Sequence, residues 1–184
     1  MAFRDYDHPA LTVDVVLLSL GARGLSVLLI QRGKPPFQGR WAFPGGFVDV
    51  GESPPEAAAR ELKEETDILD LHLEQLRAFG DPDRDPRGHT VTIAYLAVVA
   101  AQGCRPIKAG SDAAQARWWS VRDLPPLAFD HTEILDVALQ RLRSRLPCAL
   151  PEVGPFPLLP EELTLGELRA AQQAIAERLA RCTS

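Results

Sequence analysis

The chain has 184 residues, of which 46% are hydrophobic and 24% are charged, and its formal net charge is −5. This length and composition are typical of one globular domain with some chain left over, and no apolar run reaches the length that crosses a bilayer. The acidic balance argues against nucleic acid as a partner, because proteins that bind nucleic acid usually carry a basic face.

The first residues and the cysteines favour a cytoplasmic location. The opening sequence, MAFRDYDHPA, mixes charge with proline and lacks the apolar segment of a secretory signal. Cys104, Cys148 and Cys182 lie far apart and form no Cys-x-x-Cys pair, so we expect neither a disulfide framework nor a zinc site.

Two apolar runs near the N-terminus predict a β-hairpin. Residues 11–20 and 24–32 are rich in Val, Leu and Ile and are joined by the short connection GAR. Their nearly continuous apolarity indicates a sheet covered on both faces. A loop punctuated by Pro and Gly follows, with a short strand predicted around residues 41–43.

A helix is predicted from Pro54 to Thr66. Ser53 is a natural N-cap, Pro54 suits the first helical position, and Glu56 completes a capping box with Ser53. The Ala- and Glu-rich sequence that follows has high helix propensity.

The rest of the chain predicts three strands and two helices, and the strands are expected over residues 73–79, 90–100 and 115–121, with a polar turn-rich loop after the first. Residues 130–146 have the apolar spacing of an amphipathic helix. Beyond a proline-rich segment, Thr164 and Glu167 offer a second capping box for a final helix. We therefore expect one domain over residues 1–147, followed by a Pro-rich linker and a helix over residues 148–184.

Three glutamates of the first predicted helix fall on one side of it. At about 100° of rotation per residue, Glu61 and Glu65 stand nearly above one another and Glu64 lies roughly 60° away. Three like charges there repel one another unless a hard cation is present, and carboxylate oxygens suit Mg²⁺, with Mn²⁺ as an alternative. A solvated helix face would explain the charges alone, but not the glycines that precede them.

Neighbouring residues fit the same site. Arg60 reaches Glu64 at i, i+4 and can hold that side chain in place. Glu52, in the loop before the helix, can approach the cluster. Gly45 and Gly46 let the backbone come close, so that a carbonyl oxygen could complete the coordination of the ion.

The segment from Gly46 to Ile68 resembles the Nudix box, Gly-x5-Glu-x7-Arg-Glu-apolar-x-Glu-Glu-x-Gly-apolar. It departs from the box where Asp67 replaces the last glycine. Because Asp tolerates a left-handed backbone better than most residues, we expect the turn after the helix to be kept. The resemblance implies an α/β/α sandwich with a mixed sheet, extended here by a short C-terminal helical segment.

The resemblance also implies Mg²⁺-dependent hydrolysis of a nucleoside diphosphate linked to another group. The residues that it assigns are Glu61, Glu64 and Glu65 as catalytic metal ligands, the Gly45 carbonyl as a further ligand, and Glu52 and Arg60 as their catalytic support. The general base stays open between Glu64, Glu65 and Asp112, which lies in the loop before the last strand.

The stretch FGDPDRDPRGHTVTIAYLA is similar to the region that marks bacterial ADP-ribose pyrophosphatases and the ADP-ribose-sensing repressors of NAD metabolism. This similarity implies ADP-ribose as the substrate and AMP and ribose 5-phosphate as the products. The candidate substrate-binding residues are Arg32, Arg40, Asp81, Arg84, Asp85, Arg87 and Asp112. The residues of the loop itself could equally form a self-bonded surface turn.

The tail separates an enzyme from a regulator. In the repressors, a similar sequence begins a winged-helix DNA-binding region, for which residues 148–184 are too short. We therefore expect an enzyme whose tail is a vestige of that region or a packing element. The alternatives are an ADP-ribose-sensing transcriptional regulator with little catalysis, and a hydrolase of another nucleotide sugar or a nucleoside triphosphate. A homodimer is expected because relatives commonly dimerise, and a membrane partner is not.

Overall fold

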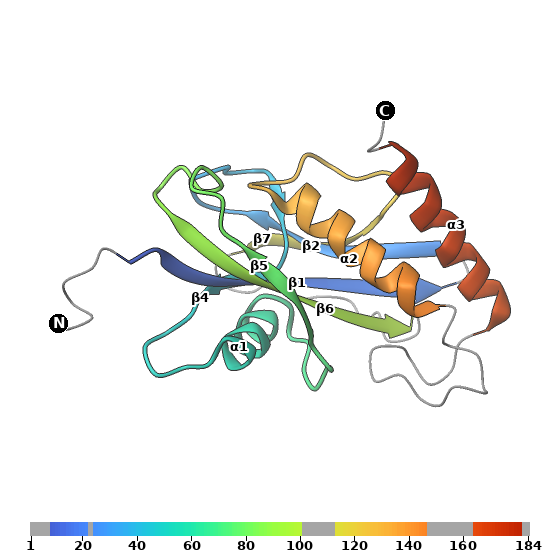
Figure 1. The fold of residues 1–184 in the computed structure, drawn as a ribbon, viewed down its shortest axis with the longest axis horizontal. Helices are drawn as coiled ribbons and strands as arrows, with labels where there is room; N and C mark the ends of the chain where they lie inside the picture. The colour runs from blue at the N-terminus through green and yellow to red at the C-terminus, as the bar shows by residue number, and fades with distance from the viewer. Residues whose placement is uncertain (1–7, 22–23, 101–112, 147–163, 182–184) are drawn as a thin grey trace.

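The structure, a computed structural model, describes residues 8–21, 24–100, 113–146 and 164–181. A mixed β-sheet lies between helix α1 (Pro54–Thr66) on one face and helices α2 (His131–Arg145) and α3 (Leu165–Arg181) on the other (Figure 1). This arrangement is the α/β/α sandwich that the resemblance implied.

Within the described residues, the sheet has seven strands, which are β1 (Ala10–Gly21), β2 (Gly24–Arg32), β3 (Trp41–Ala42), β4 (Gly45–Phe47), β5 (Glu74–Phe79), β6 (Thr90–Ala100) and β7 (Ala113–Ser120). The main order is β3-β2-β1-β6-β5, with β4 paired to β1 and β7 paired to β2. Only the pair of β1 and β6 is parallel among these strands, and it holds the middle of the sheet.

Strand β1 is buried on both faces, as its apolar sequence predicted. Val13, Val15 and Leu17 pack in the cluster that contains α1, whereas Val16, Leu18 and Leu20 pack in the cluster that contains α2 and α3. Successive side chains of a strand point to opposite faces, so one strand supplies both cores. Asp14 interrupts this pattern on the α2 face and is only 8% exposed.

The ends of helix α1 follow the predicted capping chemistry. The Glu56 carboxylate accepts hydrogen bonds from the backbone N–H and the hydroxyl of Ser53, at 2.9 and 2.6 Å. At the other end, Asp67 adopts the left-handed conformation with φ of 59°, and its N–H donates to the Lys63 carbonyl at 2.8 Å. The expected turn is therefore kept without the glycine.

Helix α3 packs on the same face of the sheet as helix α2. Ala171, Ala174 and Ile175 are buried in the core cluster of α2, and Arg178 pairs with Asp136 of α2 at 3.3 Å. The boundary expected at residue 147 lies outside the described residues. None of the described helices combines the length and the apolarity that crossing a membrane requires.

Candidate active site

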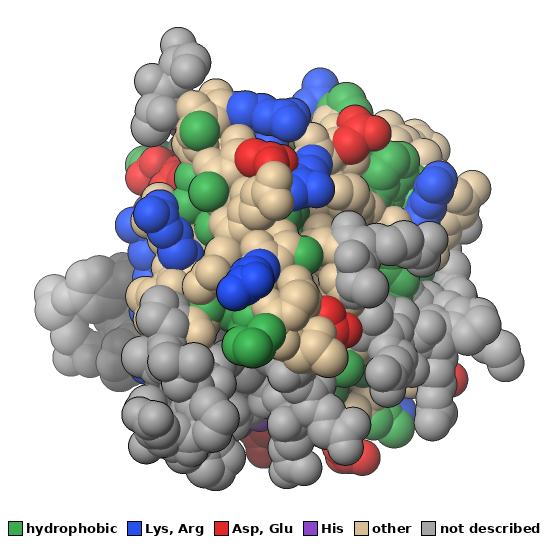
Figure 2. Space-filling view, turned by 90° about the vertical axis from the view of Figure 1, so that its right-hand side faces the viewer, with side chains coloured by type: hydrophobic (Ala, Val, Ile, Leu, Met, Phe, Trp, Pro, Cys, Tyr) green, Lys and Arg blue, Asp and Glu red, His purple; other side chains and the backbone are tan. Residues whose placement is uncertain are grey.

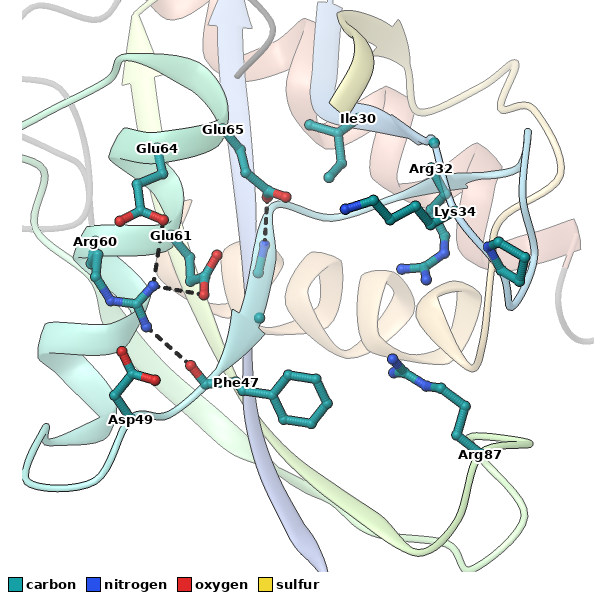
Figure 3. Close-up of a pocket in the computed structure, with 14 residues that line it drawn as sticks. Ile30, Arg32, Lys34, Phe47, Asp49, Arg60, Glu61, Glu64, Glu65 and Arg87 are labelled. Carbon is teal, nitrogen blue, oxygen red and sulfur yellow. Dashed lines mark hydrogen bonds and ion pairs between the residues drawn. The ribbon is translucent and has the colours of Figure 1, made fainter. Parts of the chain in front are cut away.

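A cavity of about 360 Å³ opens between helix α1, strand β4 and the segment that follows β2. Figure 3 shows Glu61, Glu64 and Glu65 on one side of it, presented by α1. Arg32, Lys34 and Arg87 lie across the cavity from α1 in the same view. The cavity thus has an acidic wall and a basic wall that face each other.

Two glycines allow the acidic wall to approach the sheet. A Cβ on Gly46 would lie 2.2 Å from Oε1 of Glu61, and a Cβ on Gly45 would lie 2.2 Å from the carbonyl oxygen of Val13. Both distances are far inside van der Waals contact. The space beside β4 is therefore filled by the Glu61 carboxylate and by the backbone of β1, and any side chain would displace them.

Arg60 organises the carboxylates around it. Its guanidinium donates to both carboxylate oxygens of Glu52, at 2.8 and 2.9 Å, and to Oε1 of Glu61 at 2.8 Å. The predicted contact with Glu64 is present at 3.5 Å, and a further bond reaches the Phe47 carbonyl at 3.0 Å. These bonds and charges hold the pKa of Arg60 well above its ordinary value.

Burial makes two of the three glutamates difficult to ionise. Desolvation raises the pKa of Glu65 to about 8, although the Gly45 N–H donates to its carboxylate at 2.9 Å and opposes the rise. Desolvation also raises the pKa of Glu61, against the hydrogen bond from Arg60. The side chain of Glu64 is 58% exposed.

The acidic wall has the chemistry of a hard-cation site. Its donor atoms are all oxygens. A bound cation would supply the positive charge that stabilises the ionised forms of the buried Glu61 and Glu65 side chains. Among the described residues, no three acidic, His or Cys side chains are arranged ready to hold a metal ion, and Arg60 contacts both Glu61 and Glu64. Binding a cation would therefore require these carboxylates to turn from Arg60 toward Glu65.

The basic wall draws on two separate parts of the chain. Arg32 ends strand β2, and its Nε donates to the Pro36 carbonyl at 2.8 Å. Arg87 lies in the loop before β6 and donates to Asp85 through Nε and Nη2, the latter at 2.6 Å. Arg32 and Arg87 line the same cavity, and burial together with the nearby charge of Arg87 lowers the pKa of Arg32.

A second hollow of about 140 Å³ continues from the main cavity and shares Arg32 and Arg87 with it. Arg84 lines this hollow, but it is 9% exposed and donates to both oxygens of Asp130, at 2.8 and 2.6 Å. Asp85 lies there as well and accepts from Arg87. The ion pair of Arg84 connects the polar loop to the start of α2.

Buried polar groups support the floor of this hollow. Nδ1 of His131 accepts a hydrogen bond from the Phe43 N–H at 3.0 Å, so the ring proton lies on Nε2, which faces Asp14 Oδ1 at 3.4 Å. Thr92 also donates to Asp14, at 2.7 Å. Desolvation lowers the pKa of His131 and keeps the ring neutral.

The structure brings together most of the predicted site residues. Glu61, Glu64, Glu65, Arg60 and Gly45 line the main cavity, together with Arg32 and Arg87. Glu52 stands behind Arg60, and Arg84 and Asp85 line the second hollow. Arg40 and Asp81 line neither space, and Asp112 lies outside the described residues.

Sequence reasoning missed other residues around these spaces. Lys34, Phe47 and Asp49 line the main cavity, and Asp14 and Phe129 line the second hollow. Asp14 carried a usable signal, because it is the single charged residue within the apolar run of residues 11–20. Phe129 carried none, since an isolated aromatic residue before a helix usually belongs to the core.

Comparison with known proteins agrees with this architecture. A NUDIX domain is matched over residues 8–141. The chain is 42% identical to the ADP-ribose pyrophosphatase of Methanocaldococcus jannaschii over 134 residues, which are 72% of this chain and 75% of that protein. It is 35% identical to the ADPR responsive transcriptional repressor NtrR of Acinetobacter baylyi over 175 residues, 93% of this chain and 68% of that protein.

A solved structure extends the similarity to three dimensions. The NUDIX domain of Shewanella oneidensis NrtR, in complex with ADP ribose, superimposes with a TM-score of 0.71 at 35% identity, over 77% of this chain and 94% of that one. The family match covers well over half of the sequence and includes the whole acidic wall. The chain therefore belongs to the NUDIX family.

Proposed function

We propose that this protein is a divalent-metal-dependent pyrophosphohydrolase that cleaves ADP-ribose to AMP and ribose 5-phosphate. The observation that carries the proposal is the cavity itself, in which an acidic wall on α1 faces Arg32, Lys34 and Arg87. A diphosphate between the walls would meet positive charge from both sides once a cation is bound. The similarity to an ADP-ribose pyrophosphatase and to an ADP-ribose complex supports the choice of substrate.

The acidic wall would hold Mg²⁺, with Mn²⁺ as an alternative. Its ligands would be Glu61, Glu64, Glu65 and the carbonyl of Gly45. When bound, such an ion neutralises phosphate charge and lowers the pKa of a water ligand. The pair of Arg60 and Glu52 would act as support, because Arg60 is held by Glu52 and donates a hydrogen bond to the Glu61 carboxylate.

The basic wall would bind and orient the diphosphate. Arg32 and Arg87 each use part of the guanidinium for a fixed internal bond, to Pro36 and to Asp85 respectively. Their remaining N–H groups can donate charge-assisted hydrogen bonds to phosphate oxygens. Glu64 or Glu65 would accept the proton of the attacking water, and Asp112 is the third candidate for that role.

Product analysis tests the proposal directly. The protein is incubated with ADP-ribose and Mg²⁺, and the products are separated and identified. AMP and ribose 5-phosphate are expected, and no AMP should form when Mg²⁺ is chelated. If ADP-ribose stays intact while another nucleotide sugar or a nucleoside triphosphate is cleaved, the substrate assignment is wrong and the hydrolase assignment remains.

Removing a single carboxylate tests the metal site. Glu65→Gln should reduce kcat by about two to three orders of magnitude, because it weakens the binding of the cation that would neutralise negative charge in the transition state. Folding should be preserved, since Gln keeps the shape of the side chain. A Glu65→Gln protein with undiminished turnover would contradict the ligand role. Glu167→Gln on α3, far from the cavity in sequence and structure, is the matched control.

A second candidate is an ADP-ribose-responsive transcriptional regulator. One observation favours it, which is that the similarity to the Acinetobacter repressor spans 93% of this chain. This candidate predicts ADP-ribose binding without turnover, and DNA binding that weakens with salt and is relieved by ADP-ribose. A mobility-shift assay at low salt with no retarded DNA would remove it.

We also propose that the protein is a homodimer. Leu11, Phe47 and Val50 are exposed large hydrophobic residues in or just after strands β1 and β4. Exposed apolar groups of this kind are often covered by a second subunit. Sedimentation analysis at micromolar concentration should give a dimer mass. The cytoplasmic location stays a prediction.

A further inference from the structure

Phe129, two residues before the first residue of helix α2, has an unusual backbone conformation. Its φ is 51°, in the left-handed region. Gly, Asn and Asp adopt this region readily, whereas bulky residues rarely do. Such a conformation persists only where the surroundings impose it, and these residues often cluster at functional sites. Phe129 lines the second hollow beside Arg32 and Arg87.

The Phe129 ring contacts both arginines of the basic wall. The guanidinium carbon of Arg32 lies 4.8 Å from its centroid, and that of Arg87 lies 6.0 Å from it. The two arginines come from different segments, the end of β2 and the loop before β6. The guanidinium of Arg87 also lies 5.5 Å from the Phe47 ring, so Phe129 is the aromatic contact that the two arginines share.

This contact offsets an electrostatic cost. Two guanidinium groups in one region repel each other. Burial lowers the pKa of Arg32, and the charge of Arg87 lowers it further. The negative face of an aromatic ring attracts cations within about 6 Å. Phe129 therefore favours an arrangement that the two like charges alone would oppose.

The ring itself is held in place by aromatic neighbours. It packs edge-on against Phe37 with centroids 4.9 Å apart, and it lies 5.4 Å from the ring of His131. His131 in turn stacks on Phe43 at 4.7 Å and accepts the hydrogen bond from its N–H. The position of the Phe129 ring is thus fixed to the core of the protein.

We propose that Phe129 is a positioning residue that holds Arg32 and Arg87 together as a paired clamp for the diphosphate of the substrate. This inference rests on the proposed function, since it assumes that the two arginines bind phosphate oxygens. Phe129 acts through the arginines, so its loss weakens phosphate binding even for a ligand with neither base nor sugar.

Inorganic pyrophosphate is the probe that separates this role from stacking on a substrate base. Its inhibition constant is measured against ADP-ribose hydrolysis at a constant excess of free Mg²⁺. Phe129→Leu, which keeps bulk but removes the ring, should weaken pyrophosphate inhibition and raise KM by about three- to ten-fold. The change in kcat should be smaller, and Phe129→Tyr, which keeps the ring, should restore wild-type values.

A control variant separates positioning from general destabilisation. Phe79 also lies under a guanidinium, that of Arg77 at 4.4 Å, but it lines neither space of the site. Phe79→Leu should lower the melting temperature and leave pyrophosphate inhibition unchanged. If Phe129→Leu fails to fold, Phe129→Met replaces it, because the flexible Met side chain fills a similar space.

A double-mutant comparison decides the result. Arg32→Met and Arg87→Met should each weaken pyrophosphate inhibition; if neither does, the phosphate-binding role of the basic wall is wrong. If they do, Phe129→Leu should cause little further loss of pyrophosphate inhibition in the protein that carries both arginine substitutions, because its effect passes through the arginines. Undiminished pyrophosphate inhibition in folded Phe129→Leu, or full additivity in the double-arginine background, would overturn the positioning role alone.

Discussion

At the scale of single residues, Gly46 shows how closely the site is built. Its missing side chain leaves the space that the Glu61 carboxylate occupies, since a Cβ there would lie 2.2 Å from Oε1 of Glu61. The neighbouring atom is the end of a flexible side chain, so the clash can be relieved by moving the carboxylate. Such a movement should affect the stability of the fold less than it affects the catalytic rate.

We therefore predict that Gly46→Ala lowers kcat by roughly 100-fold, because displacing a catalytic group by about 1 Å can cost that much. Steady-state kinetics and thermal unfolding measure the two effects separately. The matched control is Gly166→Ala in α3, where the nearest atom to an added Cβ is at an ordinary 3.8 Å. A fully active Gly46→Ala enzyme would show that the position of Glu61 is unimportant.

His131 makes a second prediction at this scale, because it is buried and uncharged. Its neighbours include Asp14 and Asp130, which favour the charged form, and Arg84 and Arg32, which oppose it; desolvation dominates and lowers the pKa of the ring in the folded state. In the unfolded chain the ring has an ordinary pKa of about 6.5. Below that pH the unfolded state binds the proton more readily, so stability is lost as pH falls.

Relative to His131→Gln, whose amide can still accept the bond from Phe43, the wild-type protein should lose free energy of unfolding between pH 7.5 and about pH 5.5, measured with urea. The raised pKa of Glu65 acts in the opposite direction over this range, but it does so in both proteins and cancels in the comparison. His131→Gln should be less stable at pH 7.5, and the stability difference between the two proteins should shrink as the pH falls. Equal slopes for the two proteins would mean that other groups cause the acid sensitivity.

At the scale of secondary-structure elements, the end of α1 carries the only departure from the Nudix box within the motif. Asp67 sits in the left-handed conformation with φ of 59°, where glycine has no steric cost and alanine has the full one. Its negative charge also lies at the carboxyl end of the helix, which the helix dipole disfavours. Asp67 keeps the turn, but it is less stable there than glycine would be.

Three residues at this position should therefore rank in a fixed order. Asp67→Gly should raise the free energy of unfolding by roughly 0.5 kcal/mol and Asp67→Ala should lower it by about 1 kcal/mol. Chemical denaturation of the three proteins measures the order. Alanine more stable than glycine would contradict a left-handed turn at this residue.

The elements also show which parts of the fold were visible in the sequence. The hairpin of β1 and β2, the capping boxes at Ser53 and Thr164, and the glutamates on one side of α1 depend on residues a few positions apart, and all were predicted. The parallel pairing of β1 with β6 joins residues about eighty positions apart and leaves no local pattern. The same holds for β7, which returns to pair with β2.

The site divides along the same line. The acidic wall was predictable because a single helix presents it. Arg32 and Arg87 were named as candidates one by one, but their meeting in one wall was not predictable, because the wall joins the end of β2 to a distant loop. Arg84 was predicted as a substrate contact, but the fold encloses it with Asp130, 46 positions away. Asp14 and Phe129 enter the site only because β1 and the start of α2 meet there.

At the scale of the whole molecule, charge is distributed in a way that suits an anionic substrate. The net charge is −5, yet the cavity collects three basic side chains opposite the glutamates. On the face shown in Figure 2, Lys and Arg side chains stand in separate groups among acidic and apolar residues. The basic wall lines a cavity of about 360 Å³, so it suits a small anion better than an extended one.

Helix α3 also matters at the scale of the whole molecule, because it completes the core on one face of the sheet. Ile175 is fully buried, and the helix contacts β1, β2 and α2. Arg178 pairs with Asp136, and Arg122 pairs with Glu177 at 2.7 Å, so ion pairs border the apolar contact. The described part of α3 lines neither space of the site.

Ile175→Ala should accordingly destabilise the protein by about 2–5 kcal/mol, because it opens a cavity in a packed core. Leu165→Ala, at the 66% exposed start of the same helix, should change stability by less than about 0.5 kcal/mol. Urea unfolding measures both values, and kcat/KM should be unchanged for both proteins wherever they are folded. Equal stability of the two variants would show that α3 is only loosely attached, and the core would then end at α2.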